Sequence, residues 1–116
     1  MNWLPLQNAE QLAFLKDQSF QRPACIFKHS TRCSISDMAK GRLERESNWQ
    51  EVDCYFLDLL QHRSLSNRIA EEFDVHHESP QILLIHQGSC VYDQSHNGIT
   101  VEELKEQLVQ IGSSKV

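Results

Sequence analysis

Hydrophobic positions along the chain alternate between two patterns, the spacing of an amphipathic helix and the short apolar runs of buried strands. Polar segments separate these stretches. In chain order, the patterns predict a helix capped by Asn8, a strand over 24–28, a helix over 33–46, a strand over 53–60, a helix over 66–73, strands over 81–86 and 90–92, and a last helix that Gly112 ends.

The predicted helices have recognisable caps and apolar faces. Asn8 can accept a hydrogen bond from the backbone of Gln11, and Thr100 and Glu103 have the spacing of a capping box. The apolar positions expected to face the core are Leu12, Phe14 and Leu15 in the first helix, Ile35, Met38, Ala39 and Leu43 in the second, Ile69, Ala70 and Phe73 in the third, and Val101, Leu104, Leu108 and Ile111 in the last.

The element order α-β-α-β-α-β-β-α indicates an α/β fold. A helix between the first two strands favours parallel pairing, and a tight turn at Gly88-Ser89 favours an antiparallel hairpin between the last two. We therefore expect a central mixed four-stranded sheet flanked by helices. The chain has 116 residues, enough to bury a core, so residues 1–116 are expected to form a single domain.

Charge and hydropathy narrow the class of partner. The formal net charge is −5 and no basic run or aromatic-basic stripe is present, which argues against nucleic acid. Residues 1–5 lack a basic region followed by an apolar run, and no stretch approaches the ~20 apolar residues of a membrane span. We therefore expect no membrane association and a cytoplasmic protein.

Segment 25–36 is the most informative part of the chain for chemistry. An apolar strand runs through a polar turn to Cys33, at the start of a predicted helix. A helix N-terminus favours the thiolate, and the neighbouring Arg32 adds positive charge, although a cysteine at such a position is often only a small apolar residue. Ser36 stands where a redox C-x-x-C pair has its second cysteine. Cys33 is therefore a candidate single nucleophile.

The other cysteines suggest structural positions. Four cysteines in a reducing compartment are not expected to form a disulfide framework. Cys25 and Cys54 lie in apolar strand patterns and are expected in the core, whereas Cys90 lies in a hairpin strand that can be at the sheet edge. No pair has C-x-x-C spacing and His76-His77 are adjacent, so we expect no bound metal.

Four sequence segments stand in a fixed order: KHSTRCSIS at 28–36, YFLDLL at 55–60, HHESPQ at 76–81 and SHNGI at 95–99. Together they resemble the YtxJ family of monothiol bacilliredoxins, thioredoxin-like proteins of bacteria that use the small thiol bacillithiol. The resemblance implies a thioredoxin-like fold in which Cys33 is the reactive cysteine. It also implies that Pro80 is a cis-proline that opens the hairpin strand.

The resemblance implies a one-sulfur reaction cycle. The Cys33 thiolate would attack a mixed disulfide between a protein and bacillithiol, take the small thiol onto itself and free the protein cysteine. Ser36 cannot form a disulfide, so a second low-molecular-weight thiol or a recycling reductase would complete the cycle. The expected partners are thus bacillithiolated proteins and the small thiol, which is a co-substrate rather than a bound cofactor. Such a reaction belongs to the response to oxidative stress.

Six further residues are candidates for binding substrate or modulating the sulfur. Arg32 could pair with the malate carboxylates of bacillithiol. His29 and Ser36 could act on the thiolate, but His29 is equally a structural histidine and Ser36 an ordinary first-turn residue. Ser34 adds polar surface beside Cys33. In thioredoxin-like proteins the residue before the cis-proline pairs through its backbone with an extended substrate, which makes Ser79 and Pro80 binding candidates, with a plain turn as the alternative.

The chain departs from the pattern of dithiol thioredoxins at one position, and the resemblance leaves other functions open. Dithiol thioredoxins place a buried carboxylate six residues before the nucleophile, and here that position is Phe27. A non-catalytic thioredoxin-like stress or binding protein, whose cysteine small thiols merely modify, is the main alternative. A glutathione-dependent glutaredoxin would share the chemistry, but the chain lacks a C-P-Y-C type site.

Overall fold

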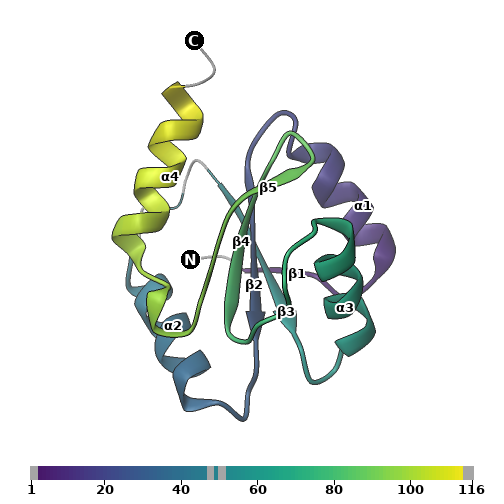
Figure 1. Ribbon diagram of the computed structural model, residues 1–116, viewed down its shortest axis with the longest axis vertical. Helices are drawn as coiled ribbons and strands as arrows, with labels where there is room; N and C mark the ends of the chain where they lie inside the picture. Colours follow the sequence, from purple (N-terminus) through teal and green to yellow (C-terminus); the bar gives the residue numbers. More distant parts are fainter. Residues whose placement is uncertain (1–2, 47–48, 50–51, 114–116) are drawn as a thin grey trace.

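A five-stranded mixed sheet lies at the centre of the structure, with helices on both faces (Figure 1). The computed structural model describes residues 3–46, 49 and 52–113. Across the sheet the strands run in the order β1 (Leu4–Pro5), β3 (Asp53–Asp58), β2 (Ala24–His29), β4 (Gln81–His86) and β5 (Ser89–Ser95). The helices are α1 (Ala9–Gln18), α2 (Ser34–Arg45), α3 (Arg63–Glu72) and α4 (Val101–Ser113), and a 3-10 turn, η1 (His96–Gly98), precedes α4.

Strand β2 is the central strand, and both of its faces are covered. Alternate side chains point to opposite faces of a sheet. Ala24 and Ile26 therefore join one apolar cluster, together with residues of α1 and α3. Cys25 and Phe27 join a second cluster, together with residues of α2 and α4. Every residue of β2 is buried, which explains why apolar residues follow one another in its sequence instead of alternating with polar ones.

The predicted thioredoxin-like α/β fold is confirmed, with one strand more than expected. β3 pairs parallel with β2, and β4 pairs antiparallel with both β2 and β5. The additional strand, β1, pairs parallel with β3 in the register Leu4 to Tyr55, and the Leu6 N–H extends this pairing to the Phe56 carbonyl at 3.0 Å. Two residues, one of them Pro5, are too short a run to show strand periodicity, so the sequence pattern missed it.

Several element ends differ from the sequence-based expectation. β3 stops at Asp58, because residues 59–60 form a turn, and α3 begins at Arg63, three residues earlier than expected. α4 runs through Gly112 to Ser113, so Gly112 does not end the helix. The described helices include none that is long and apolar enough to cross a lipid bilayer.

Three apolar residues expected to face the core are instead on the surface. Phe14 and Met38 are each 58% exposed, and Ile35 is 37% exposed. On α1 the buried positions are Leu12 and Leu15, and on α2 they are Ser36, Ala39 and Leu43. Each helix contacts the sheet through one narrow stripe, and Phe14, Ile35 and Met38 lie beside that stripe.

The β4–β5 hairpin turns at Gln87-Gly88, one residue before the predicted position. Both residues have positive φ, 53° and 80°, as a two-residue primed turn requires. A Cβ atom on Gly88 would lie 3.1 Å from the ring of Phe20. Gly88 is therefore favoured both by its backbone conformation and by the space around it.

We predict that Gly88→Ala lowers the free energy of unfolding by about 1–2 kcal/mol, because alanine resists the left-handed backbone and contacts Phe20. Gly112→Ala is the matched control, since nothing lies within 4 Å of its added Cβ and the site is helical. That variant should gain about 0.5–1 kcal/mol. Urea denaturation measures both, and equal effects of the two substitutions would contradict the turn geometry.

Candidate functional site

Cys33 is the N-cap residue of α2, directly after the loop that leaves β2. Its backbone is extended, with φ −115° and ψ 119°. The Cys33 N–H donates to the Ser30 carbonyl at 3.1 Å, and the Cys33 carbonyl accepts from the Asp37 N–H at 3.1 Å. The Cys33 thiol makes no capping bond to the helix and is partly exposed. The sulfur is thus left available at the positive end of the α2 dipole.

His29 and Ser36 form a buried hydrogen bond behind the Cys33 loop. His29 Nδ1 lies 2.6 Å from Ser36 Oγ, and the Ser30 N–H donates to the same oxygen at 3.1 Å. His29 Nε2 lies 3.5 Å from the Asp37 carboxylate. A hydrogen on Nε2 facing Asp37 leaves Nδ1 as the acceptor of the Ser36 hydroxyl, which is the arrangement of a neutral histidine.

The rings around His29 keep it in an apolar setting. His29 is 3% exposed, stacks on Phe27 at 5.8 Å between ring centroids and lies 5.3 Å from the ring of Phe56. Burial lowers the pKa of His29, and the charge of Asp37 opposes this only partly. The imidazole is therefore held neutral at physiological pH. It lies on the same face of β2 as Phe27.

Ser36 is completely buried, and both His29 and Ser30 use its hydroxyl. The hydroxyl therefore holds the first turn of α2 against the end of β2. Direct donation from Ser36 to a Cys33 thiolate stays a prediction.

Ser36→Ala should lower the free energy of unfolding by about 1–3 kcal/mol, because His29 Nδ1 and the Ser30 N–H would lose their buried partner. Ser34→Ala is the control, since Ser34 is exposed on the same helical turn, and its effect should stay within about 0.5 kcal/mol. Thermal melting of the two variants compares them. If Ser36→Ala is as stable as Ser34→Ala, the buried hydrogen bond does not contribute to the free energy of unfolding.

Arg32 and Ser34 flank Cys33 on the surface. Both side chains are exposed, as are those of Ile35 and Met38 on the first turns of α2. The sequence-predicted residues Arg32 and Ser34 therefore lie where a ligand approaching the Cys33 sulfur would meet them. Ile35 and Met38, which the sequence pattern had assigned to the core, therefore add apolar side chains to this surface.

Ser79 and Pro80 lie at the same end of the sheet as the Cys33 loop. The Ser79-Pro80 peptide bond is cis, as the family resemblance implied. β4 runs antiparallel to β2 with Gln81 opposite Lys28, so Pro80 comes beside the end of β2 from which the loop to Cys33 departs. Pro80 is buried, its carbonyl accepts from the His96 N–H at 3.0 Å, and Ser79 Oγ is buried without a hydrogen-bond partner in the described chain.

Lys28 is a buried lysine that the sequence reasoning missed. It is 0% exposed, and its Nζ donates to the Ser66 carbonyl at 3.2 Å and to His77 Nδ1 at 3.3 Å. Burial lowers the pKa of Lys28 from 10.5 to about 8. The signal in the sequence was a charged residue within the apolar run of β2, a strand whose two faces are both covered by helices.

Lys28 and Gln81 together hold the segment that leads to the cis-proline. Lys28 contacts His77, and Gln81 Nε2 donates to the His76 carbonyl at 2.9 Å. Lys28 and Gln81 are opposite each other in the β2–β4 register. The segment 76–80 is thereby anchored from the sheet face that carries α3, while the Cys33 loop is anchored from the face that carries α2.

The buried Lys28 predicts a distinct pH dependence. Below about pH 8 the folded state bears the cost of a buried cation, and this cost disappears as pH rises toward the ordinary value of 10.5. The stability of the wild type relative to Lys28→Met should therefore rise by about 3 kcal/mol between pH 7 and pH 10.5. Urea denaturation of both proteins across this range tests it. A constant difference would mean that Lys28 titrates alike in both states.

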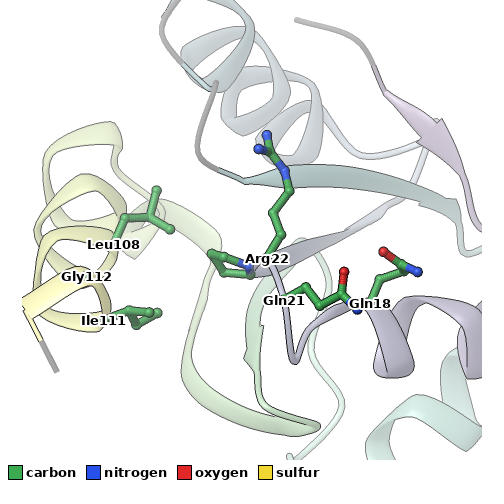
Figure 2. Close-up of a pocket in the computed structure, with 7 residues that line it drawn as sticks. Gln18, Gln21, Arg22, Leu108, Ile111 and Gly112 are labelled. Carbon is green, nitrogen blue, oxygen red and sulfur yellow. The ribbon is translucent and has the colours of Figure 1, made fainter. Parts of the chain in front are cut away.

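A cavity of about 600 Å³ lies at the opposite end of β2 from Cys33. Gln18, Gln21 and Arg22 line one side of it and Leu108, Ile111 and Gly112 of α4 the other (Figure 2). Residues 21–23 precede β2, whereas Cys33 follows it, so this cavity is separate from the Cys33 site. Within residues 3–46, 49 and 52–113, no three His, Cys, Asp or Glu side chains gather as metal ligands.

Comparison with known families gives a match over most of the chain. Residues 4–104 match the model of a family described as monothiol bacilliredoxin BrxC. This range includes Cys33, Ser36 and the Ser79-Pro80 pair.

Comparison with solved structures gives thioredoxin folds. A solved structure described as having a thioredoxin fold is 29% identical, with a TM-score of 0.79 over 89% of this chain and 90% of its own. The thioredoxin of Trypanosoma brucei brucei is 11% identical, with a TM-score of 0.77 over 97% of this chain and 92% of its own. Malassezia sympodialis thioredoxin is 12% identical, with a TM-score of 0.73 over 94% and 90%.

Proposed function

The chain belongs to the monothiol bacilliredoxin family, and from that premise we propose that it is a cytoplasmic thiol–disulfide oxidoreductase that removes bacillithiol from protein mixed disulfides. Two features of the site carry the proposal. The Cys33 thiol is half-buried and makes no capping hydrogen bond, and the Ser36 side chain three residues later is a hydroxyl that is hydrogen-bonded to His29. One sulfur is available at the site for exchange, and the position of a resolving thiol is filled by an oxygen.

The proposed cycle has two exchange steps. The Cys33 thiolate attacks the bacillithiol sulfur of the mixed disulfide, the protein cysteine leaves as a thiolate and takes up a proton, and Cys33 carries the bacillithiol. A second low-molecular-weight thiol then attacks this adduct, and the small disulfide leaves. A partner reductase can take the place of the second thiol. The electrons that reduce the target protein come from the small thiols, and Cys33 is regenerated.

The positions of the other cysteines support a one-sulfur cycle. Cys25 and Cys54 are buried at the start of β2 and β3, whereas Cys33 follows the end of β2. Strand β2 has six residues, which corresponds to roughly 16–20 Å of extended chain. Cys90 lies near the start of β5, on the strand at the sheet edge. None of these three is positioned to replace the second thiol of a C-x-x-C pair.

Substrate recognition in this proposal uses the rim of the Cys33 site. Backbone groups of Ser79 would pair with an extended segment of the target protein, because Ser79 lies at the end of the sheet from which the loop to Cys33 departs. The exposed guanidinium of Arg32 would bind the malate carboxylates of bacillithiol in a bidentate manner. Exposed Ile35 and Met38 would contact apolar groups of the target.

Turnover of a bacillithiolated protein tests the function directly. With a large excess of substrate over enzyme and free bacillithiol present, the wild type should release many target thiols per molecule. Cys33→Ser should reduce the rate to the uncatalysed background, and Cys90→Ala should retain it, because Cys90 lies outside the site. Release that stops at one target thiol per Cys33 would instead support a thioredoxin-like binding or stress protein that small thiols merely modify.

A further inference from the structure

Cys25 and Cys54 lie side by side in the core, away from the Cys33 site. They are register partners on the neighbouring parallel strands β2 and β3. Both side chains belong to the apolar cluster on the α2 and α4 face of the sheet, so they point to the same side. Interaction with Cys54, together with burial, raises the pKa of Cys25, and interaction with Cys25 lowers the pKa of Cys54. The two thiols are therefore neighbours in the core.

The backbone spacing at this pair suits a disulfide. Neighbouring strands lie about 4.8 Å apart, and the Cα atoms of disulfide-linked cysteines are usually roughly 4.4–6.8 Å apart. Because Cys25 and Cys54 share a register position and a face, their Cβ atoms project in the same direction. A disulfide between them needs rotation of the side chains rather than movement of the strands.

The open cavity beside α4 lies at this end of the sheet. The cavity of about 600 Å³ is lined by Pro23 and by Ile111, which belongs to the same apolar cluster as both cysteines (Figure 2). The Pro23 carbonyl accepts from the Asp53 N–H at 3.1 Å, and Asp53 directly precedes Cys54. Pro23 precedes Cys25 by two residues, and Asp53 precedes Cys54 by one. Cys54 is 5% exposed and Cys25 is 1% exposed, so Cys54 is the more exposed of the two residues.

We propose that Cys25 and Cys54 form a second redox site, which a hydroperoxide oxidises to an internal disulfide. The Cys54 thiolate attacks the peroxide oxygen, and water or an alcohol leaves, so that Cys54 becomes a sulfenic acid. The Cys25 sulfur then attacks the Cys54 sulfur, and the hydroxyl leaves as water with the proton of Cys25. The pair loses two electrons and the hydroperoxide gains them. This chemistry is independent of the function proposed for Cys33.

The disulfide would close a loop that runs from the start of β2, through α2, to the start of β3. Cys33 lies within this loop. A cross-link at its ends restricts the unfolded chain, so the oxidised protein should melt at a higher temperature than the reduced one. Oxidation of the core would thus stabilise the domain under the conditions in which Cys33 is needed.

The experiment uses a Cys33→Ser, Cys90→Ala variant, in which the pair supplies the remaining thiols. After treatment with hydrogen peroxide, the intact mass should fall by that of two hydrogen atoms. Iodoacetamide should then label neither cysteine in denaturant until a reductant is added, and the melting temperature should rise. Adding Cys25→Ala to the same background is the matched control, which should gain oxygen at Cys54 and form no internal disulfide.

Retention of both free thiols, at a peroxide concentration that oxidises Cys33 in the wild type, would overturn the proposal. Disulfide formation only between two molecules, seen on a non-reducing gel, would also overturn it. If the double variant does not fold, peptide mapping of the peroxide-treated wild type replaces it. A cross-linked peptide pair with Cys25 and Cys54 supports the proposal, and cross-links through Cys33 contradict it. None of these results depends on turnover by Cys33.

Discussion

The hydrogen bond between His29 and Ser36 joins the last residue of the central strand to the first turn of the helix that presents Cys33. Both groups are buried, so the bond exchanges little with water, and its loss would leave polar atoms unpaired in an apolar setting. The loop between strand and helix is short, and this contact fixes its shape. The position of the candidate nucleophile, Cys33, therefore depends on a hydrogen bond in which its sulfur takes no part.

The site depends on the alternation of side chains along β2. His29 points toward α2 and holds the Cys33 loop, whereas Lys28 points toward α3 and contacts His77 ahead of the cis-proline. Two adjacent polar residues in an otherwise apolar strand thus anchor the two loops between which a mixed disulfide would bind. Burial lowers both pKa values, so His29 is neutral at physiological pH, whereas Lys28 stays protonated below about pH 8.

Sequence periodicity predicted the order of the longer elements, the parallel and antiparallel pairings and the helix at Cys33. It could do so because both faces of the sheet are buried, and this burial produces long apolar patterns in the sequence. It failed for β1, whose two residues have no period, and for Met38, whose apolar side chain is on the surface beside the candidate nucleophile. The His29–Ser36 bond was beyond sequence reasoning, since it depends on the angle at which α2 leaves the loop. The cis bond before Pro80 came from family resemblance and not from periodicity.

The central claim is that Cys33 works with one sulfur because position 36 carries a hydroxyl. The most direct test compares the wild type with Ser36→Cys by intact mass after reaction with oxidised bacillithiol. The wild type should carry one bacillithiol on Cys33, and the variant should convert this adduct into a disulfide between residues 33 and 36, one helical turn apart. An internal disulfide from Cys33 to Cys25, Cys54 or Cys90 in the wild type, formed as fast as turnover, would contradict the account.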